Sequence, residues 1–420
     1  MPAAEDLLRA VRHEGPRSVA WRVLKRLAGS RPVHEPELHV FPEDVLGAEW
    51  ACEAAQGSPG PSGPRAVSGT GRVAWVVSPP SASSGGHQTA FRFISALERA
   101  GHPTTVYLYH ARRWPRITVD SVRALLEQAS GLARLEAQLR MYDPMEGIEP
   151  GFDALFATDW PTAYAVSRYP GPALRFSFVQ DLEALFYPRS SAFVLAESSH
   201  RLGLHAITMG PWLARRLRED HGVRADAIEF GVDTGVYRRS NDERRKEIAF
   251  YTRPPTPRRG HELGMLALQA LHEARPDIPI HLVGWELPAS AVPFPAVRHG
   301  LLDPPGLAEL YNRCAAVLSI SLTNMSLVPL EAMAAGAVAV VNDGDSTRDA
   351  IHGDGLVRAQ LSPAAMARAL AAAVDDPGQQ ERSRRIAASV RGDDWAGRGE
   401  RFVRLVEDAL QAAASLGQGR

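Results

Sequence analysis

Short apolar runs alternate with amphipathic, helix-like stretches along most of the chain after Arg72. Five strand-like runs precede Asn241 and four more follow it, so the pattern begins twice. Alternation of this kind is typical of a mostly parallel sheet with helices on both faces. The expected strands are 73–78, 104–109, 153–157, 175–179, 206–209, 248–251, 280–283, 316–320 and 338–341, and the expected helices are 87–100, 212–221, 263–274, 306–314, 327–335 and 362–374.

Two α/β series in one chain predict two domains, and 420 residues are enough for two separate cores. We expect the first domain at 71–240 and the second at 241–385. A C-terminal helix at 386–420 is expected to return to the first domain. A cleft between two such domains is the preferred place for a small ligand.

Residues 1–70 are predicted to be a helical extension and a linker rather than part of either domain. Residues 1–30 alternate apolar and basic side chains, as in an amphipathic helix. Such a helix either lies on a membrane surface or docks on the same protein, or on a second copy in a homodimer. Residues 56–71 are rich in Gly, Pro and Ser and predict a flexible linker.

Composition narrows the class of protein without naming its partner. A formal charge of −1 gives no general attraction to nucleic acid. Cys52 and Cys314 are too few for a disulfide framework or a cysteine-based zinc site. No apolar run reaches the length of about 20 residues that spans a bilayer. We therefore expect a cytoplasmic protein, at the inner face of the membrane if residues 1–30 bind lipid.

An arginine-rich loop follows the expected strand 248–251. Arg253, Arg258 and Arg259 lie just past the carboxyl end of this strand, where open α/β sheets bind ligands. A guanidinium stays charged and donates paired hydrogen bonds to phosphate oxygens. The loop therefore predicts a phosphate site, although taken alone it also fits an ordinary surface loop.

A second candidate segment lies about 70 residues further on. Ser326 is a candidate N-cap, and Gly336 is placed to end the same helix. Leu327 and Val328 would then present backbone N–H groups to an anion. Glu331 lies one turn later, where its carboxylate can accept hydrogen bonds from sugar hydroxyls. Together with the arginines, this segment predicts a nucleotide diphosphate pocket, whereas alone it also fits a capped core helix.

These features resemble the GT-B glycosyltransferases, and in particular the large family 4 type. The chain has a Gly85-Gly86 turn after its first expected strand and a Gly101-His102 pair before the second, as members of that family usually do. The resemblance covers about residues 71–400. It implies two Rossmann-like domains facing a cleft, with an N-terminal acceptor domain and a C-terminal donor domain.

Three short segments look like the bacterial rhamnosyltransferases of the WsaF type. They are 180–188, 196–204 and 207–213. The narrower resemblance implies a nucleotide-sugar donor, with dTDP-rhamnose favoured, and a saccharide or glycoconjugate acceptor.

The chain departs from the broad family at two positions. The family pairs two glutamates with seven residues between them, and the first of these positions is Thr323 here. The family also often carries a His-Asp pair where this chain has Gln180-Asp181. In the family that histidine approaches the far end of the donor hexose, so an amide here suits a 6-deoxy sugar.

The resemblance assigns roles to the candidate residues. Arg253 and Arg259 would hold the diphosphate, Arg258 could substitute for Arg259, and Glu331 would accept a ribose hydroxyl. The other expected donor-binding residues are Gly85, Gly86, Thr323, Asn324, Ser326, Leu327 and Val328, and the expected acceptor-binding residues are His87, Asp159, Gln180 and Asp181.

Family 4 enzymes retain the configuration at the transferred carbon, and no cofactor or metal is expected. The triplet Asp343-Gly344-Asp345 matches a metal-binding motif of another glycosyltransferase fold, but it follows an expected strand and is predicted to form a turn.

Two alternatives stay open at this point. A sugar-nucleotide epimerase would bind the same diphosphate without an acceptor. A catalytically silent GT-B protein that binds a partner would explain the missing carboxylate at Thr323. The base of the nucleotide, the exact sugar and the linkage are not fixed by the sequence.

Overall fold

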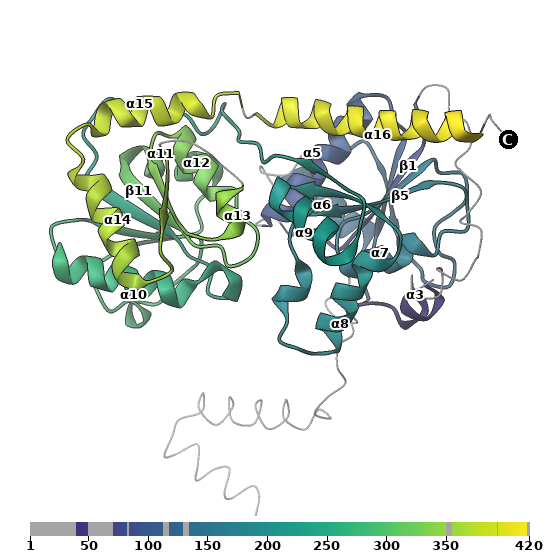
Figure 1. Cartoon of the computed structure of the whole chain (residues 1–420), viewed down its shortest axis with the longest axis horizontal. Coiled ribbons are helices and arrows are strands. Elements are labelled where there is room, and N and C mark those ends of the chain that lie inside the picture. The colour runs from purple at the N-terminus through teal and green to yellow at the C-terminus, as the bar shows by residue number, and fades with distance from the viewer. Residues whose placement is uncertain are drawn as a thin grey trace, which may run out of the picture. The chain divides into compact units, whose positions relative to one another are not determined.

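The computed structural model contains two fully parallel β-sheets, each with helices on its faces (Figure 1). It describes residues 39–48, 70–81, 84–111, 117–128, 134–349, 355–392 and 394–417. Residues Val40–Arg420 belong to one compact unit. The basic stretch 1–30 and most of the predicted linker lie outside the described residues.

The first sheet has seven strands in the order β3-β2-β1-β4-β5-β6-β7. Its strands are β1 (Val73–Val77), β2 (Thr104–Leu108), β3 (Gln138–Met141), β4 (Ala154–Ala157), β5 (Leu174–Val179), β6 (His205–Met209) and β7 (Ala225–Ile228). Its helices are α5 (Gly85–Arg99), α6 (Val119–Gln128), α7 (Trp160–Ser167), α8 (Ser191–Ser198) and α9 (Pro211–His221), with short 3-10 turns η1 (Glu183–Phe186) and η2 (Ser199–Arg201).

The second sheet has six strands in the order β10-β9-β8-β11-β12-β13. Its strands are β8 (Glu247–Tyr251), β9 (Ile280–Val283), β10 (Val297–Gly300), β11 (Cys314–Ser319), β12 (Val338–Asn342) and β13 (Leu356–Ala359). The elements between and after them are η3 (Pro257–Arg259), α10 (His261–Ala274), η4 (Ala289–Ala291), α11 (Pro304–Arg313), α12 (Val328–Ala334), α13 (Asp345–Arg348), α14 (Pro363–Asp375) and α15 (Gln379–Ser389).

Both sheets have the doubly wound order of a Rossmann fold, so the predicted fold class is confirmed. The order reverses between β1 and β4 in the first sheet and between β8 and β11 in the second. Ligands of such sheets bind beyond the carboxyl ends of the strands at this reversal. The loops after β1, β4, β8 and β11 are therefore the places to look for a site.

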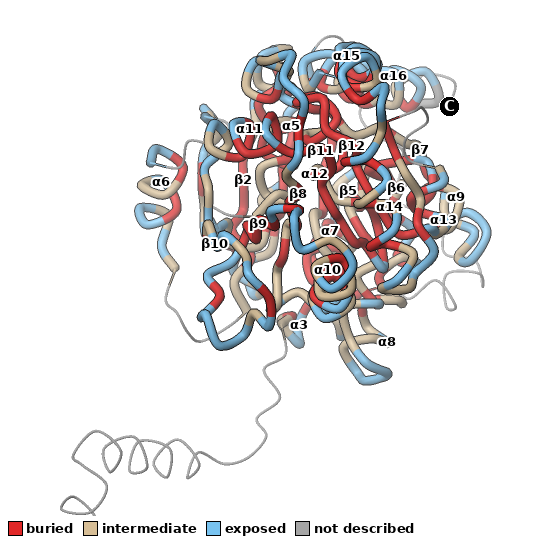
Figure 2. Tube along the Cα trace, turned by 90° about the vertical axis from the view of Figure 1, so that its left-hand side faces the viewer, coloured by how far each residue is buried: buried red, intermediate tan, exposed pale blue. Residues whose placement is uncertain are grey.

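The two sheets have separate hydrophobic cores, and Figure 2 shows the buried positions concentrated along their strands. In the first core Trp75 stacks on Phe156 with ring centroids 4.3 Å apart. The long C-terminal helix α16 (Trp395–Gly417) adds Phe402, Val406 and Leu410 to the same core. This helix thus contributes to the first sheet although it follows the second sheet in the sequence.

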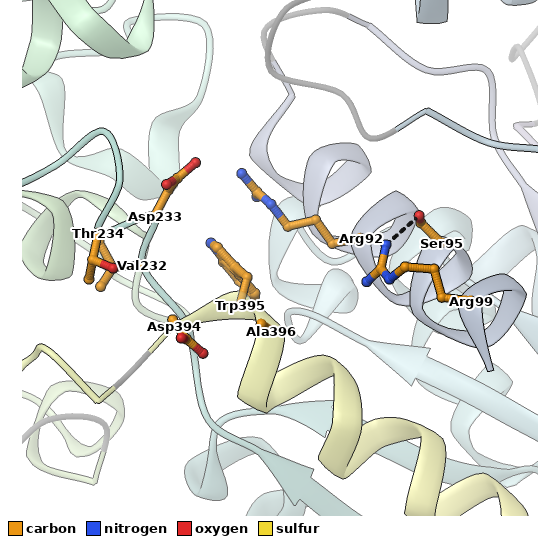
Figure 3. A pocket seen from close by; sticks show the side chains of 9 residues that line it. All are labelled: Arg92, Ser95, Arg99, Val232, Asp233, Thr234, Asp394, Trp395 and Ala396. Atoms are coloured by element: carbon orange, nitrogen blue, oxygen red, sulfur yellow. Dashed lines mark hydrogen bonds between the residues drawn. The ribbon is translucent and has the colours of Figure 1, made fainter.

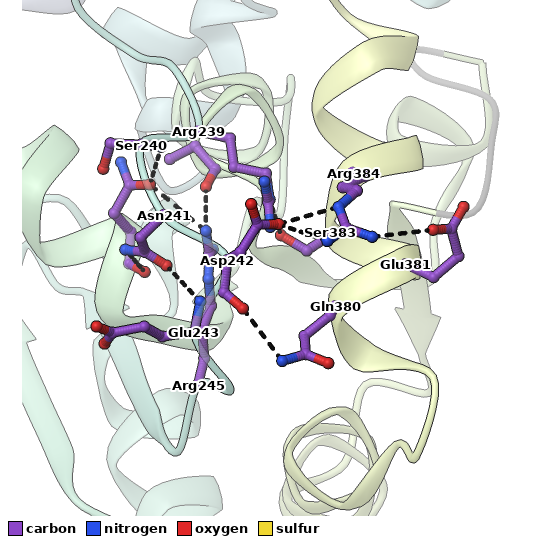
Figure 4. Close-up of polar contacts among 12 residues, drawn as sticks. Arg239, Ser240, Asn241, Asp242, Glu243, Arg245, Gln380, Glu381, Ser383 and Arg384 are labelled. Atoms are coloured by element: carbon purple, nitrogen blue, oxygen red, sulfur yellow. Dashed lines mark hydrogen bonds and ion pairs between the residues drawn. The ribbon is translucent and has the colours of Figure 1, made fainter.

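The segment that leads into β8 is fastened to helix α15 (Figure 4). Asp242 accepts hydrogen bonds from Arg239 and Arg384. Arg245 is 4% exposed and donates to the carbonyls of Tyr311 and Ala335, at the ends of α11 and α12. Burial lowers the pKa of Arg245 to about 10, so its guanidinium remains charged at neutral pH and neutralises these helix ends.

Residues 40–48 lie in the same compact unit as the two sheets, within the stretch 1–70 that the sequence assigns to an extension and linker. Helix α3 (Pro42–Gly47) carries Asp44, which is fully buried. Asp44 accepts a 2.7 Å hydrogen bond from the hydroxyl of Tyr142 and pairs with Arg168. Composition alone missed this short helix because its burial depends on partners about 100 residues away in the chain. Within the described part of the chain, no helix has the length and apolar character needed to cross a bilayer.

Candidate functional site

The arginine loop lies at the carboxyl end of β8, as the sequence predicts. Arg259 donates from Nη1 to the hydroxyl of Ser321 at 2.6 Å and to the carbonyl of Asn324 at 2.9 Å. Its burial lowers the pKa to about 10, which leaves the side chain charged at neutral pH. Gly260 follows with φ +57°, and a Cβ there would lie 2.6 Å from Ile320. The tight turn that presents the arginines therefore requires glycine.

Arg258 faces the first sheet. Its guanidinium carbon lies 3.7 Å from the centre of the Phe186 ring, and its Nε is 3.4 Å from Oδ2 of Asp181. A cation over an aromatic face next to a carboxylate is held in place from two sides. Arg253 is half-buried in the loop between β8 and η3. Which of the three arginines contact the diphosphate stays a prediction.

Glu331 projects from helix α12 into a largely buried environment. Burial raises the pKa of its carboxyl to about 7, and the positive charge of Arg92 and a hydrogen bond from Tyr237 limit this rise. Arg92 comes from α5 and Tyr237 from the segment between the two sheets. A carboxyl with a pKa near neutrality changes its charge in the working range of most enzymes.

Arg92 also lines a pocket of about 300 Å³, where it points toward Asp233 (Figure 3). Its guanidinium carbon lies 4.8 Å from the centre of the Trp395 ring. Arg92 and Tyr237 could not be recognised from the sequence, because each lies far along the chain from Glu331 and in no motif.

Helix α12 begins differently from the prediction. Leu327 is its N-cap, in a helical conformation, and no side chain caps the helix. The N-cap prediction for Ser326 is therefore wrong, because the Ser326 hydroxyl instead lies 3.2 Å from the hydroxyl of Ser319. Val328 is the first residue of the helix, and Gly336 follows its end with φ +83° as expected of a helix-ending glycine.

Thr323 and Asn324 lie in the loop between β11 and α12, and both side chains contact the first sheet's domain. The Thr323 hydroxyl donates to Asp181 at 2.8 Å, and the Asn324 backbone N–H donates to the same carboxylate at 3.0 Å. The Asn324 side-chain amide donates to the carbonyls of Gln180 and Met209, at 2.8 and 2.9 Å. These four contacts join the carboxyl ends of β5 and β6 to the loop that precedes α12.

The expected acceptor residues cluster at the carboxyl ends of β1, β4 and β5. His87 lies in the first turn of α5, and its Nε2 is 3.1 Å from the carbonyl of Ser78. The Ser78 hydroxyl donates to Asp159, which also caps α7. Gln180 donates to the carbonyl of Gly86 at 3.1 Å. The structure thus brings His87, Asp159 and Gln180 to one edge of the first sheet, next to the glycine turn.

Glu183 is a member of this cluster that the sequence did not reveal. Its carboxylate accepts a 2.6 Å hydrogen bond from the backbone N–H of Trp160. Burial, with the nearby charges of Asp159 and Asp181, raises the pKa of Glu183 well above its ordinary value. Burial also raises the pKa of Asp159 and lowers that of His87. The cluster therefore favours neutral side chains, which can donate or accept a proton near a substrate hydroxyl.

The triplet Asp343-Gly344-Asp345 lies where β12 ends and α13 begins. Asp343 forms two hydrogen bonds of 2.8 Å with Arg348, and Asp345 lies 3.6 Å from the same arginine. Arg348 therefore pairs with both carboxylates of the triplet. Among the described residues, no group of three or more His, Cys, Asp or Glu side chains is arranged to hold a metal ion.

Comparison with known proteins shows which family the site-bearing part of the chain is similar to. Residues 246–371 match the family described as WsaF, C-terminal domain. This segment contains the arginine loop and helix α12. The chain resembles the WsaF type of GT-B glycosyltransferase. The match supports the resemblance expected from the sequence and is centred on the half that carries the arginines and Glu331.

The WsaF-like chain is 30% identical over 342 residues to the O-antigen biosynthesis protein RfbC of Myxococcus xanthus. The alignment covers 79% of this chain and 26% of RfbC, so the chain spans about a quarter of that relative's length.

Solved structures with the same fold include Anabaena HepE in complex with UDP-glucose, with a TM-score of 0.61 and 13% identity over 80% of this chain and 100% of HepE. A putative UDP-N-acetylglucosamine 2-epimerase from Listeria monocytogenes gives a TM-score of 0.53 with 11% identity, covering 82% of this chain and 97% of the epimerase. At such low identity these likenesses establish the fold alone, and the fold does not separate a transferase from an epimerase.

Proposed function

We propose that the WsaF-like chain transfers a sugar from a nucleotide diphosphate donor to a hydroxyl group of a saccharide or glycoconjugate acceptor. The observation that carries this proposal is the position of the arginine loop and of Glu331. They follow β8 and β11, the neighbouring strands between which the sheet order reverses. Cations for a diphosphate and a carboxyl for a nucleoside hydroxyl thus meet where such a ligand binds.

The chemistry needs a stabilised leaving group. As the bond between the anomeric carbon and the phosphate oxygen breaks, its electron pair leaves with the nucleotide diphosphate. Arg253 and Arg259 lie in the connection between β8 and α10, where their charges would offset this negative charge. The acceptor oxygen forms the new bond to the same carbon and loses its proton.

We further propose that the reaction proceeds with retention and without a metal ion. In a retaining reaction the departing phosphate lies on the same face as the acceptor and can take its proton, so no protein base is required. Three arginines in one loop supply the positive charge that a metal ion provides in other sites. A chelator should therefore leave turnover unchanged.

For the donor sugar we propose rhamnose or another 6-deoxyhexose, carried by dTDP. The match to the WsaF family supports this choice. Gln180 supports it as well, since its side-chain amide is fastened to the Gly86 carbonyl and brings no charge to the sugar. In dTDP the ribose lacks a 2′-hydroxyl, so Glu331 would accept a single hydrogen bond from the 3′-hydroxyl.

For the acceptor we propose a saccharide bound at the edge formed by His87, Asp159 and Gln180. The O-antigen role of RfbC supports a polysaccharide product. The expected cytoplasmic location, the membrane contact of residues 1–30 and a homodimer also remain proposals.

Calorimetric titration with dTDP-rhamnose and with UDP-glucose tests the donor. Tighter binding of dTDP-rhamnose is expected, and equal or tighter binding of UDP-glucose would overturn the rhamnose assignment. Release of free nucleotide diphosphate distinguishes the reactions, since a transferase releases it in proportion to acceptor added. An epimerase would instead convert the nucleotide sugar in the absence of acceptor.

A further inference from the structure

Asp181 is almost completely buried, and its two carboxylate oxygens are used by the other domain. Oδ2 accepts from the Thr323 hydroxyl at 2.8 Å, and Oδ1 accepts from the Asn324 backbone N–H at 3.0 Å. Oδ1 also accepts from the backbone N–H of Leu182 at 2.9 Å. Asp181 is 7% exposed, Thr323 5% and Asn324 2%. A carboxylate committed in this way has little capacity left for a substrate hydroxyl.

The loop that Asp181 holds is itself joined to the arginines. The carbonyl of Asn324 accepts from Arg259 at 2.9 Å, and the hydroxyl of Ser321 accepts from the same Nη1 at 2.6 Å. The backbone N–H of Leu322 donates to the carbonyl of Arg258 at 2.9 Å. Hydrogen bonds therefore connect Asp181 to Arg259 through one residue, Asn324.

Arg258 connects to Asp181 directly. Its Nε lies 3.4 Å from Oδ2 of Asp181. Its guanidinium lies over the ring of Phe186, the last residue of the 3-10 turn η1 that begins just after Asp181. Because both arginines belong to the second sheet's domain and Asp181 to the first, the contact crosses between the two domains. The position of the arginine side chains thus depends on a carboxylate outside their own domain.

We propose that Asp181 is a positioning residue for the diphosphate site, acting through Asn324 on Arg259 and by its charge on Arg258. This inference rests on the proposed function and deepens it. It replaces the expected acceptor contact of Asp181 with a donor-side role. It also gives Thr323 a function, since its hydroxyl donates to Asp181, whereas a carboxylate at 323 would repel it.

The physical reason is preorganisation. A guanidinium that is free to rotate loses side-chain entropy when it binds phosphate, whereas one held in place has already lost it. The Asp181 network holds Arg259 through Nη1, which donates to the carbonyl of Asn324. Donor affinity is therefore coupled to contact between the domains.

The experiment measures the dissociation constant of a nucleoside diphosphate by calorimetry, using dTDP, UDP and GDP with the full chain and carrying forward the tightest binder. Asp181→Asn, which keeps the size of the side chain, is expected to weaken binding about tenfold, a typical effect of one charge-assisted hydrogen bond. Thr323→Val should also weaken binding. Thr323→Ser should bind like the wild type, because it keeps the hydroxyl. Asp226→Asn is the matched control, since Asp226 pairs with His205 within the first sheet's domain and should leave affinity unchanged.

The decisive comparison combines Asp181→Asn with Arg259→Ala. If Asp181 acts through Arg259, most of the effect of Asp181→Asn disappears once Arg259 is alanine. Equal losses in both backgrounds, or no loss in either, would overturn the positioning role while leaving the proposed function intact. Wild-type protein that binds none of the three diphosphates would overturn the proposed function and this inference together. Melting temperatures of all variants, measured without nucleotide, identify any variant that fails to fold, and the Thr323→Val and Thr323→Ser pair then decides.

Discussion

Replacing Glu331 by glutamine should make the protein relatively more stable at high pH. Burial raises the pKa of this carboxyl from an ordinary 4.5 to about 7, and the charge of Arg92 and the Tyr237 hydrogen bond only partly offset the effect. Below about pH 4.5 the carboxyl is protonated in both the folded and unfolded chain, so it carries no penalty. Between about pH 4.5 and about pH 7 the unfolded chain ionises this group while the folded protein still holds the proton, so stability falls progressively and the loss is complete above pH 7.

The size of this loss follows from the shift. A rise of the pKa from 4.5 to about 7 corresponds to at most about 3 kcal/mol of unfolding free energy above pH 7. Glutamine has nearly the same shape and cannot ionise, so Glu331→Gln avoids this loss. For a folding unit of about 150–250 residues, 1 kcal/mol shifts the melting temperature by roughly 2–4 °C. A relative gain of several degrees is therefore expected for Glu331→Gln between about pH 5 and about pH 8.

Melting temperatures of the wild type and of Glu331→Gln, measured across this range without nucleotide, test the reasoning. All other titrating groups are shared by the two proteins, so their contributions cancel in the difference. Glu381→Gln serves as the control, since Glu381 is an exposed glutamate on α15. If the difference in melting temperature between wild type and Glu331→Gln is the same at all pH values, the assigned burial of the carboxyl is refuted. Binding of a nucleotide whose hydroxyl donates to Glu331 should in addition release protons near pH 7, because the contact favours the ionised form.

Arg253→Ala and Arg259→Ala should each weaken nucleotide diphosphate binding about ten- to a hundredfold, because a charge-assisted contact is worth about 1.5–3 kcal/mol; calorimetry that finds both variants binding like wild type would remove the donor site. Asp44→Ala should lower stability by about 2 kcal/mol, since it leaves Arg168 and the Tyr142 hydroxyl without their shared partner; unchanged thermal unfolding would show that α3 contributes nothing. Deletion of residues 1–38 should preserve nucleotide binding, because all proposed donor residues lie elsewhere, whereas a deletion that reaches residue 60 also removes α3 and should lower the melting temperature.

The sequence predicted the inner strands of both sheets and missed the outer ones. Every strand expected from an apolar run lies inside a sheet, and central strands such as β1 and β12 are buried at all positions. The strands without a prediction, β3, β7, β10 and β13, are the four edges. Their burial is interrupted, as in Gln138–Met141, where only Leu139 is fully buried. An edge strand has a neighbour on one side only, so its sequence lacks the continuous apolar run that identifies an inner strand.

Some residues of the candidate site could likewise be recognised from the sequence, and others could not. Arg259 and Glu331 could be found because each lies in a motif with a local signal, a loop after a strand or a helix after a turn. Arg92, Tyr237 and Glu183 could not, because their relevance comes from neighbours brought together only by the packing of distant segments. Ser326 was misassigned as an N-cap, since its preference for that position was outweighed by the contact with Ser319.

Helix α16 has a consequence for the order in which the protein is made. Phe402 packs within 5.9 Å of Trp75 and 5.6 Å of Phe156, so the core of the first domain includes a side chain from near the end of the described chain. During synthesis Trp75 and Phe156 leave the ribosome long before Phe402 does. The aromatic core of the first domain therefore stays incomplete until α16 has been synthesised, whereas strands β8 to β13 can pair before that. In this chain the domain translated first is completed last, and a chaperone that covers apolar surface would act on it rather than on the second domain.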